Sequence, residues 1–138
     1  MKVMVNGTFD ILHRGHIELL NYAKSQGDQL LVAIDTDRRV RELKGQNRPV
    51  NNQDDRKLFL YNLKAVDIVM LFDSQEDLIN IMKEYKPDIY VKGDDWKKDR
   101  PSTAEKFCDR VIYYPRIPNY STTNIISRCS TMDSTGSS

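Results

Sequence analysis

Short apolar runs alternate along the chain with stretches that carry apolar residues at helical spacing. We predict buried strands from these runs, because short continuous apolar segments are typical of strands that are covered on both faces of a sheet. The predicted strands are residues 2–6, 29–35, 66–72, 88–93 and 110–116.

The segments between these strands predict amphipathic helices. The first begins near His13 and would end at Gly27, a residue type that often caps the carboxyl end of a helix. A second is predicted within residues 51–64, and a third begins at Ser74 with a Ser-x-x-Asp cap. The polar stretch around Lys44 shows neither a strand nor a helix pattern.

This alternation of strands and helices predicts an α/β fold, with a single doubly wound parallel sheet of five strands and right-handed crossovers. In such sheets ligands bind outside the carboxyl ends of the strands. We therefore expect the functional residues to lie at that edge.

Composition narrows the function classes only moderately. The 138 residues are 39% hydrophobic and 30% charged, which suits one domain, and the net charge of +1 gives no reason to expect a nucleic-acid or membrane partner. Cys108 and Cys129 share no metal-ligand spacing, and we expect reduced thiols. With no apolar span or export leader in the sequence, we expect a cytoplasmic protein. The Ser- and Thr-rich residues 129–138 are expected to form a disordered tail.

The stretch GTFDILHRGH, residues 7–16, holds both histidines of the chain and follows the first predicted strand. His13 and His16 would share one face of the first helical turn, where unpaired N–H groups favour anions. Ordinary surface or cap histidines are the simpler alternative. A zinc site fits poorly, because no third or fourth ligand stands nearby.

This stretch closely resembles the signature of the cytidylyltransferase branch of the nucleotidyltransferase superfamily, whose His-x-Gly-His motif binds a nucleoside triphosphate. The resemblance extends from Lys2 to about Arg128, which gives a nucleotidyltransferase domain of residues 1–128. It implies a Rossmann-like fold and attack of a phosphorylated alcohol or sugar on the α-phosphate, with release of pyrophosphate. It also implies Mg²⁺ held by the triphosphate rather than by protein ligands, and a homodimer.

The resemblance assigns roles to residues across the chain. Four are expected to be catalytic, with Lys44 in a mobile loop that reaches the phosphates: His13, His16, Lys44 and Arg116. A second set is expected to bind the nucleotide: Gly7, Thr8, Phe9, Gly93, Asp94, Asp95, Trp96, Ser121 and Thr122. Two residues are candidate acceptor contacts, Asp10 and Arg56, although Arg56 could equally be an ordinary charge on a helix surface.

The mechanism expected from these residues is direct in-line displacement without a covalent enzyme intermediate, because no activated nucleophile stands in a motif. Catalysis would then rest on positioning and on neutralising charge. The second family signature is matched imperfectly, since the chain has RIPNYSTT where the family has a Thr after the Arg and a Gly further on. This departure leaves the roles of Ile117 and Asn119 open.

The sequence points to two substrate pairs. GTFD, GDDW and the Pro-Arg before the Ser-Thr-Thr run resemble glycerol-3-phosphate cytidylyltransferases and favour CTP. Three other stretches resemble the heptose-1-phosphate adenylyltransferase domain and favour ATP: LKGQNRPVNNQDDR, VDIVMLFDSQEDLINIMKEYKPDIYVKG and NYSTTNIISR. We expect CTP with a glycerol, polyol or sugar phosphate, with ATP and heptose 1-phosphate as the alternative. A non-catalytic nucleotide-binding regulatory module, or a domain detached from a larger bifunctional enzyme, stays open.

Overall fold

The structure is a computed structural model that describes residues 1–93 and 103–115. Strands and helices alternate along the described chain, with one short 3₁₀ helix, η1. They are β1 (Lys2–Gly7), α1 (Arg14–Ser25), β2 (Gln29–Asp35), α2 (Asp37–Lys44), α3 (Gln53–Tyr61), β3 (Ile68–Phe72), α4 (Gln75–Tyr85), β4 (Ile89–Gly93), η1 (Thr103–Phe107) and β5 (Arg110–Tyr114). All five predicted strands are confirmed, although β3 begins two residues later than predicted.

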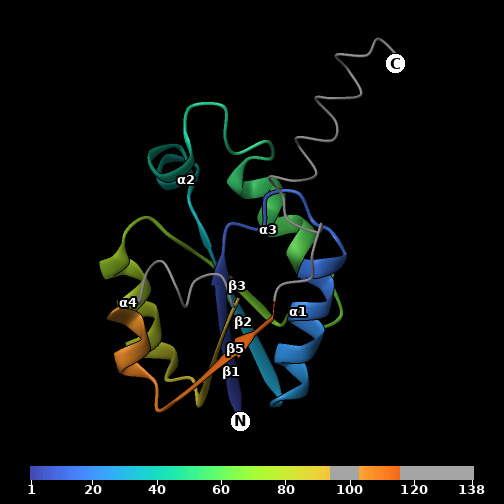
Figure 1. The fold of residues 1–138 in the computed structure, drawn as a ribbon, viewed down its shortest axis with the longest axis vertical. Coiled ribbons are helices and arrows are strands. Elements are labelled where there is room, and N and C mark those ends of the chain that lie inside the picture. The colour runs from blue at the N-terminus through green and yellow to red at the C-terminus, as the bar shows by residue number, and fades with distance from the viewer. Residues whose placement is uncertain (94–102, 116–138) are drawn as a thin grey trace.

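The strands form one parallel sheet in the order β3-β2-β1-β4-β5. The strand order therefore reverses between β1 and β4, and this reversal is the point where doubly wound sheets bind ligands. In Figure 1 the carboxyl ends of the strands lie away from the labelled N-terminus, on the side of α2 and α3. The predicted doubly wound α/β fold is confirmed.

The helices cover both faces of the sheet, with α1 and α4 on opposite sides (Figure 1). One core cluster joins β-strand side chains such as Val3 and Val5 to α1 and α3 through Leu20 and Leu60. The other cluster joins the opposite face of the strands to α4 and η1. Because adjacent strand residues face opposite layers, both faces of the central strands carry mostly apolar side chains, and the polar residues lie at or near the strand ends.

Local sequence signals explain where α3 and α4 begin. The Asn52 side chain accepts a hydrogen bond from Asp55 N (2.8 Å), and the Ser74 hydroxyl accepts one from Asp77 N (3.1 Å). Side-chain oxygens at this position satisfy helix N–H groups that would otherwise lack a partner. The predicted Ser-x-x-Asp start of α4 is confirmed.

Helix α2 was not predicted. Lys44 is its last residue, so the structure corrects the expectation that Lys44 lies in a polar loop. Its apolar residues are only Val40, which is buried, and Leu43, which is exposed, and a single pair at this spacing is too short a pattern to predict a helix. The helix begins at Thr36, whose hydroxyl accepts from Arg39 N (3.3 Å), a cap signal that could have revealed it.

Gly27 does not cap α1 as predicted, because the cap is Gln26. A side chain at Gly27 would place its Cβ 2.4 Å from the Met1 carbonyl oxygen and 2.8 Å from Val3 Cγ2. The glycine is therefore needed for close packing of this turn against the start of β1. The predicted tail 129–138 lies outside the described residues.

Candidate active site

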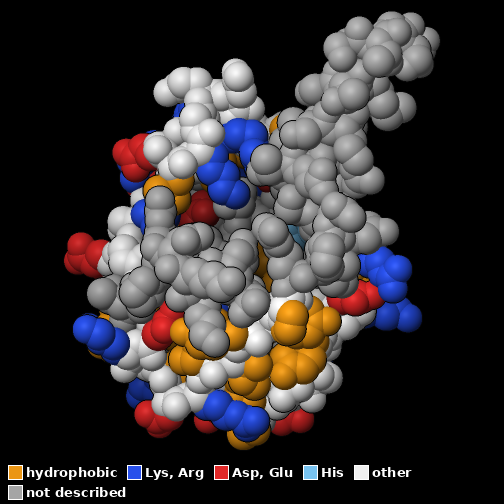
Figure 2. All heavy atoms as spheres, viewed as in Figure 1, with side chains coloured by type: hydrophobic (Ala, Val, Ile, Leu, Met, Phe, Trp, Pro, Cys, Tyr) orange, Lys and Arg blue, Asp and Glu red, His pale blue; other side chains and the backbone are white. Residues whose placement is uncertain are grey.

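The two histidines lie at the carboxyl end of β1, where the chain turns into α1. Their rings stack with centroids 3.8 Å apart and planes inclined by 25°. The Phe9 ring lies 5.0 Å from the His16 ring and is almost fully buried. In Figure 2 a small area of histidine side chain is visible on the face viewed, with a group of Lys and Arg side chains above it.

His13 starts α1. Its extended backbone makes it the N-cap, and its Nδ1 accepts a hydrogen bond from Gly15 N (3.1 Å). In a neutral imidazole the other nitrogen then carries the proton, so Nε2–H is a donor. His13 therefore fixes the helix start and holds a hydrogen-bond donor beside it.

His16 is held in its neutral form. Burial above all, and then the charges of His13 and Lys44, lower the pKa of His16 to about 3. Its Nδ1 is buried, and no atom of residues 1–93 or 103–115 forms a hydrogen bond with it. Burial also lowers the pKa of His13. Near neutral pH the pair thus offers uncharged N–H donors, which can strengthen as negative charge develops on a ligand.

Lys44 contributes positive charge to the same end of the sheet. Its charge acts to lower the pKa of His16, which follows β1, and the pKa of Asp35, which ends β2. Helix α2, which ends at Lys44, thus brings the lysine towards the histidines, as the sequence predicts, although from a helix end rather than from a loop. The arrangement places an ammonium and two imidazoles around the helix start.

Gly7 and Phe9 form a tight pair at the exit of β1. A Cβ on Gly7 would lie 2.9 Å from Phe9 Cε2, and Phe9 has a left-handed backbone with φ of 50°. The absence of a side chain at Gly7 therefore makes room for the Phe9 ring. Because that ring is buried, only the backbone of Phe9 remains for the predicted nucleotide contact.

Arg56 is not an ordinary charge on a helix surface, because its side chain has no exposed area. Its guanidinium donates to the carbonyl oxygens of Thr8 (3.0 Å), Asp35 (2.8 Å) and Asn51 (3.0 Å). It also pairs with Asp37 Oδ1 at 2.8 Å. Arg56 therefore fixes the ends of β1 and β2, and its position offers no support for the predicted acceptor contact.

Asp10, the other predicted acceptor contact, is also buried, with 1% of its surface exposed. Its carboxylate accepts hydrogen bonds from Val50 N (2.7 Å) and Asn51 N (2.8 Å). The Asn51 side chain donates in return to the Asp10 carbonyl (2.9 Å). Asp10 thus ties the loop after β1 to the segment that precedes α3.

Asp35 is a site residue that the sequence analysis missed. It ends β2 and is 7% exposed, and its carboxylate accepts hydrogen bonds from Thr8 Oγ1 (3.0 Å) and Arg39 Nε (3.3 Å). Burial raises its pKa against the opposing effects of Thr8, Arg39 and Lys44. Its place at the carboxyl end of a predicted strand was the signal that could have found it.

A second missed cluster lies on the other face of the sheet, at the end of β4. Lys92 is 3% exposed and pairs with Glu105 Oε1 at 2.6 Å, while Tyr113 OH donates to Glu105 Oε2 at 2.8 Å. The pair joins β4 to η1 and so fixes the strand end that carries Gly93. Gly93 itself is the last residue of β4, as predicted.

The remaining predicted site residues lie outside the described residues. They are Asp94, Asp95, Trp96, Arg116, Ser121 and Thr122. Their roles stay predictions.

Residues 4–128 match the family model described as Cytidylyltransferase-like. The chain belongs to this family. It is therefore a nucleotidyltransferase domain, and the resemblance of its His-x-Gly-His stretch is confirmed at the level of the family.

Named relatives show similarity over most of the chain. The bifunctional protein HldE of Campylobacter fetus is 48% identical over 126 residues, 91% of this chain and 27% of that protein. HldE of Aliarcobacter butzleri is 40% identical over 126 residues, 91% of this chain and 26% of that protein. The crystal structure of a lipopolysaccharide core biosynthesis protein from Thermoplasma volcanium is 32% identical, with a TM-score of 0.72 over 85% of this chain and 98% of that one. The chain thus spans about a quarter of the length of these curated relatives.

The described residues also bear on metal binding and on the membrane. Residues 1–93 and 103–115 contain no group of three or more His, Cys, Asp or Glu side chains able to hold a metal ion. The buried carboxylates Asp10 and Asp35 are already engaged with N–H and hydroxyl donors. This donor set fits Mg²⁺ that arrives on the triphosphate better than Mg²⁺ bound by these side chains.

Among the described helices, none is long and apolar enough to cross a membrane.

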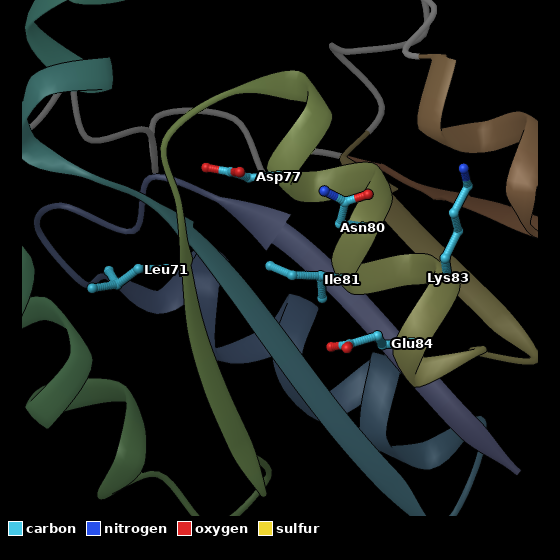
Figure 3. A pocket seen from close by; sticks show the side chains of 6 residues that line it. All are labelled: Leu71, Asp77, Asn80, Ile81, Lys83 and Glu84. Atoms are coloured by element: carbon cyan, nitrogen blue, oxygen red, sulfur yellow. The ribbon is translucent and has the colours of Figure 1, made fainter.

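A pocket of about 460 Å³ lies away from the histidines. Figure 3 shows the lining side chains of α4, with Leu71 on the neighbouring strand β3 pointing away from that helix. The lining residues are Leu71, Asp77, Asn80, Ile81, Lys83 and Glu84. None of them belongs to the family motif, so we place the active site at the histidines and not in this pocket.

Proposed function

We propose that this nucleotidyltransferase domain transfers AMP from ATP to the phosphate of a heptose 1-phosphate. The observation that carries the proposal is the 48% identity over 126 residues to a bifunctional protein HldE, because the match covers 91% of the chain. The stretches that resemble the heptose-1-phosphate adenylyltransferase domain, residues 43–56 and 66–93, support the same substrate pair. This proposal replaces CTP, the nucleotide favoured by the sequence analysis, with the alternative.

The proposed reaction is an in-line displacement. A phosphate oxygen of the sugar phosphate attacks the α-phosphorus of ATP and forms a new P–O bond. The bond from the α-phosphorus to the bridging oxygen of the β-phosphate breaks, and pyrophosphate leaves with that electron pair. The product is a sugar linked to ADP, and no bond to the protein forms at any stage.

The contribution of the protein is to hold the phosphates and to balance their charge. His13 Nε2–H and the neutral His16 ring stand at the start of α1, where the first N–H groups of the helix also favour an anion. Lys44 adds a full positive charge near them. Mg²⁺ bound to the triphosphate would add further neutralisation of the leaving pyrophosphate. Loss of one such donor costs on the order of 10²–10³ in rate.

CTP with glycerol 3-phosphate is the second candidate, since the GDDW stretch and Arg116 resemble the cytidylyltransferases. Gly93 is the only member of this set within the described residues. The two candidates differ in base and in acceptor, so they can be separated by one set of assays.

The experiment is pyrophosphate release in Mg²⁺ buffer, with ATP and CTP each tested against heptose 1-phosphate and glycerol 3-phosphate. We expect turnover with ATP and heptose 1-phosphate at least tenfold above each other pair. Turnover only with CTP and glycerol 3-phosphate would establish the second candidate. Nucleotide binding without turnover in any mixture would favour a regulatory module.

The homodimer is a separate proposal that follows from the family resemblance. Light scattering coupled to gel filtration measures the solution mass directly. A mass of twice 16.1 kDa supports the dimer, and a mass equal to one chain contradicts it.

A further inference from the structure

Among the three nitrogens of the Arg48 guanidinium, only Nε donates a hydrogen bond to a described residue. Arg48 lies in the segment between α2 and α3, and its side chain is 13% exposed. Its Nε donates to Asp10 Oδ2 at 3.4 Å. Nη2 is buried without a hydrogen-bond partner, and no described residue accepts a hydrogen bond from Nη1. Buried donors in proteins are almost always paired, so these N–H groups call for an acceptor.

The position of Arg48 is fixed by Asp10. The Asp10 carboxylate accepts from Val50 N and Asn51 N as well as from Arg48 Nε, so it holds both the backbone and the side chain of this segment. An arginine held at Nε presents its two Nη groups as a preorganised pair of donors. A pair of this kind matches two oxygens of a phosphate.

The same contacts join Arg48 to the segment between β1 and α1 that leads to the histidines. Asp10 directly follows Phe9, whose ring lies 5.0 Å from the His16 ring. Lys44, whose charge acts on His16, lies four residues before Arg48 on the other side of a short turn. Arg48 is therefore tied through Asp10 to the loop that leads into α1, although it is not part of the His-x-Gly-His motif.

The proposed reaction needs a second anion at this place. A sugar phosphate must approach the negatively charged triphosphate closely enough for one of its oxygens to attack. Two anions repel one another, and a fixed cation on the acceptor side offsets that repulsion and orients the attacking oxygen. His13, His16 and Lys44 are already assigned to the triphosphate, whereas no described residue accepts a hydrogen bond from Nη1 or Nη2 of Arg48.

We propose that Arg48 binds the phosphate of the acceptor through Nη1 and Nη2, and that Asp10 is the positioning residue that holds it. This inference rests on the proposed function for the existence of an acceptor phosphate. It does not depend on which nucleotide is used, because it concerns the acceptor side of the site alone.

The test is a kinetic comparison of Arg48→Gln and Arg48→Lys with the natural chain. Arg48→Gln should raise KM for the acceptor at least tenfold and leave KM for the nucleotide within twofold. Arg48→Lys should fall between them, because it keeps the charge and loses the pair of donors. Arg41→Gln, at an exposed position on α2, is the matched control and should change neither KM. Urea unfolding of each variant checks that the fold is retained.

Two results would overturn the proposal. One is a rise of KM for the nucleotide equal to that for the acceptor, and the other is no change in the acceptor KM beyond twofold. Should the natural chain turn over only CTP and glycerol 3-phosphate, the adenylyltransferase proposal fails, and the same KM comparison still decides the role of Arg48.

A binding measurement covers the case of no turnover. Calorimetric titration of heptose 1-phosphate and of glycerol 3-phosphate, each with a non-hydrolysable ATP analogue present, should show binding to the natural chain that weakens at least tenfold in Arg48→Gln. Equal binding to both proteins, or binding of the ATP analogue without either acceptor, overturns the assignment of Arg48.

Discussion

Replacement of Arg56 by methionine should strongly destabilise the fold. The guanidinium is fully buried and donates to three carbonyl oxygens and to Asp37 Oδ1. Methionine fills a similar volume but leaves these acceptors without donors. Removal of one partner of a buried ion pair costs about 3–5 kcal/mol. We expect a cost within this range and not above it, because Asp37 is 25% exposed and water can partly replace the lost guanidinium.

Equilibrium unfolding in urea measures this cost. A loss of about 3–5 kcal/mol lowers the urea midpoint by about 2 M for a typical m-value of about 2 kcal/mol/M. Arg56→Lys should fall between the natural chain and Arg56→Met, since a lysine keeps the charge but cannot reach all four acceptors. Arg41→Met at an exposed site of α2 is the control and should leave the midpoint unchanged.

A midpoint for Arg56→Met within about 0.5 M of the natural value, which is about 1 kcal/mol at that m-value, would refute this reasoning. It would mean that the strand ends hold their positions without the buried guanidinium. If Arg56→Met is too unstable to purify, Arg56→Lys is measured instead, because its smaller expected loss of stability is still measurable.

Three further predictions concern residues around the histidines. Between pH 6.5 and about pH 3 the His16 side chain is protonated in the unfolded chain but neutral in the folded chain. The free energy of unfolding should therefore fall as the pH falls. From neutral pH to about pH 5 this loss is about 2 kcal/mol, and urea unfolding of His16→Gln should lack that component. Gly7→Ala should cost about 1–3 kcal/mol in the same assay because its Cβ would meet Phe9 Cε2 at 2.9 Å, and an unchanged midpoint would contradict the packing. Lys44→Gln should lower kcat on the order of 10²-fold, whereas Arg41→Gln should not, and equal effects would argue against a specific role for Lys44.

The architecture could be predicted from the sequence because each central strand contains a short continuous run of apolar residues. Residues 29–35 form a strand with the predicted bounds, since β2 is covered by helices on both faces. Helix α2 escaped prediction because Val40 and Leu43 are its only apolar residues, and one pair three residues apart is too short a periodic pattern. Its existence depends on the Thr36 cap and on contacts with other parts of the chain, which a local reading of hydrophobicity does not weigh.

In the candidate site, too, some features could be predicted from the sequence and others could not. The clustering of His13 and His16 at a helix start follows from their spacing and from the glycine and strand before them. The burial of Arg56 and Asp10 could not be predicted, because it arises from contacts between segments that lie from 19 to 48 residues apart in sequence. Charged residues in a polar stretch look solvated in sequence, yet here they hold the loops of the site together.

The most direct test of the central claim is the rate of AMP transfer by a His13→Asn variant. Asparagine is a good N-cap, so the variant should keep the start of α1 and a urea midpoint close to that of the natural chain, while it loses the Nε2–H donor. With ATP, heptose 1-phosphate and Mg²⁺, mass spectrometry of the sugar–nucleotide product should show a rate on the order of 10²–10³ below that of the natural chain. A folded variant with a rate within a few-fold of the natural chain would contradict the claim that the paired histidines bind the reacting phosphates.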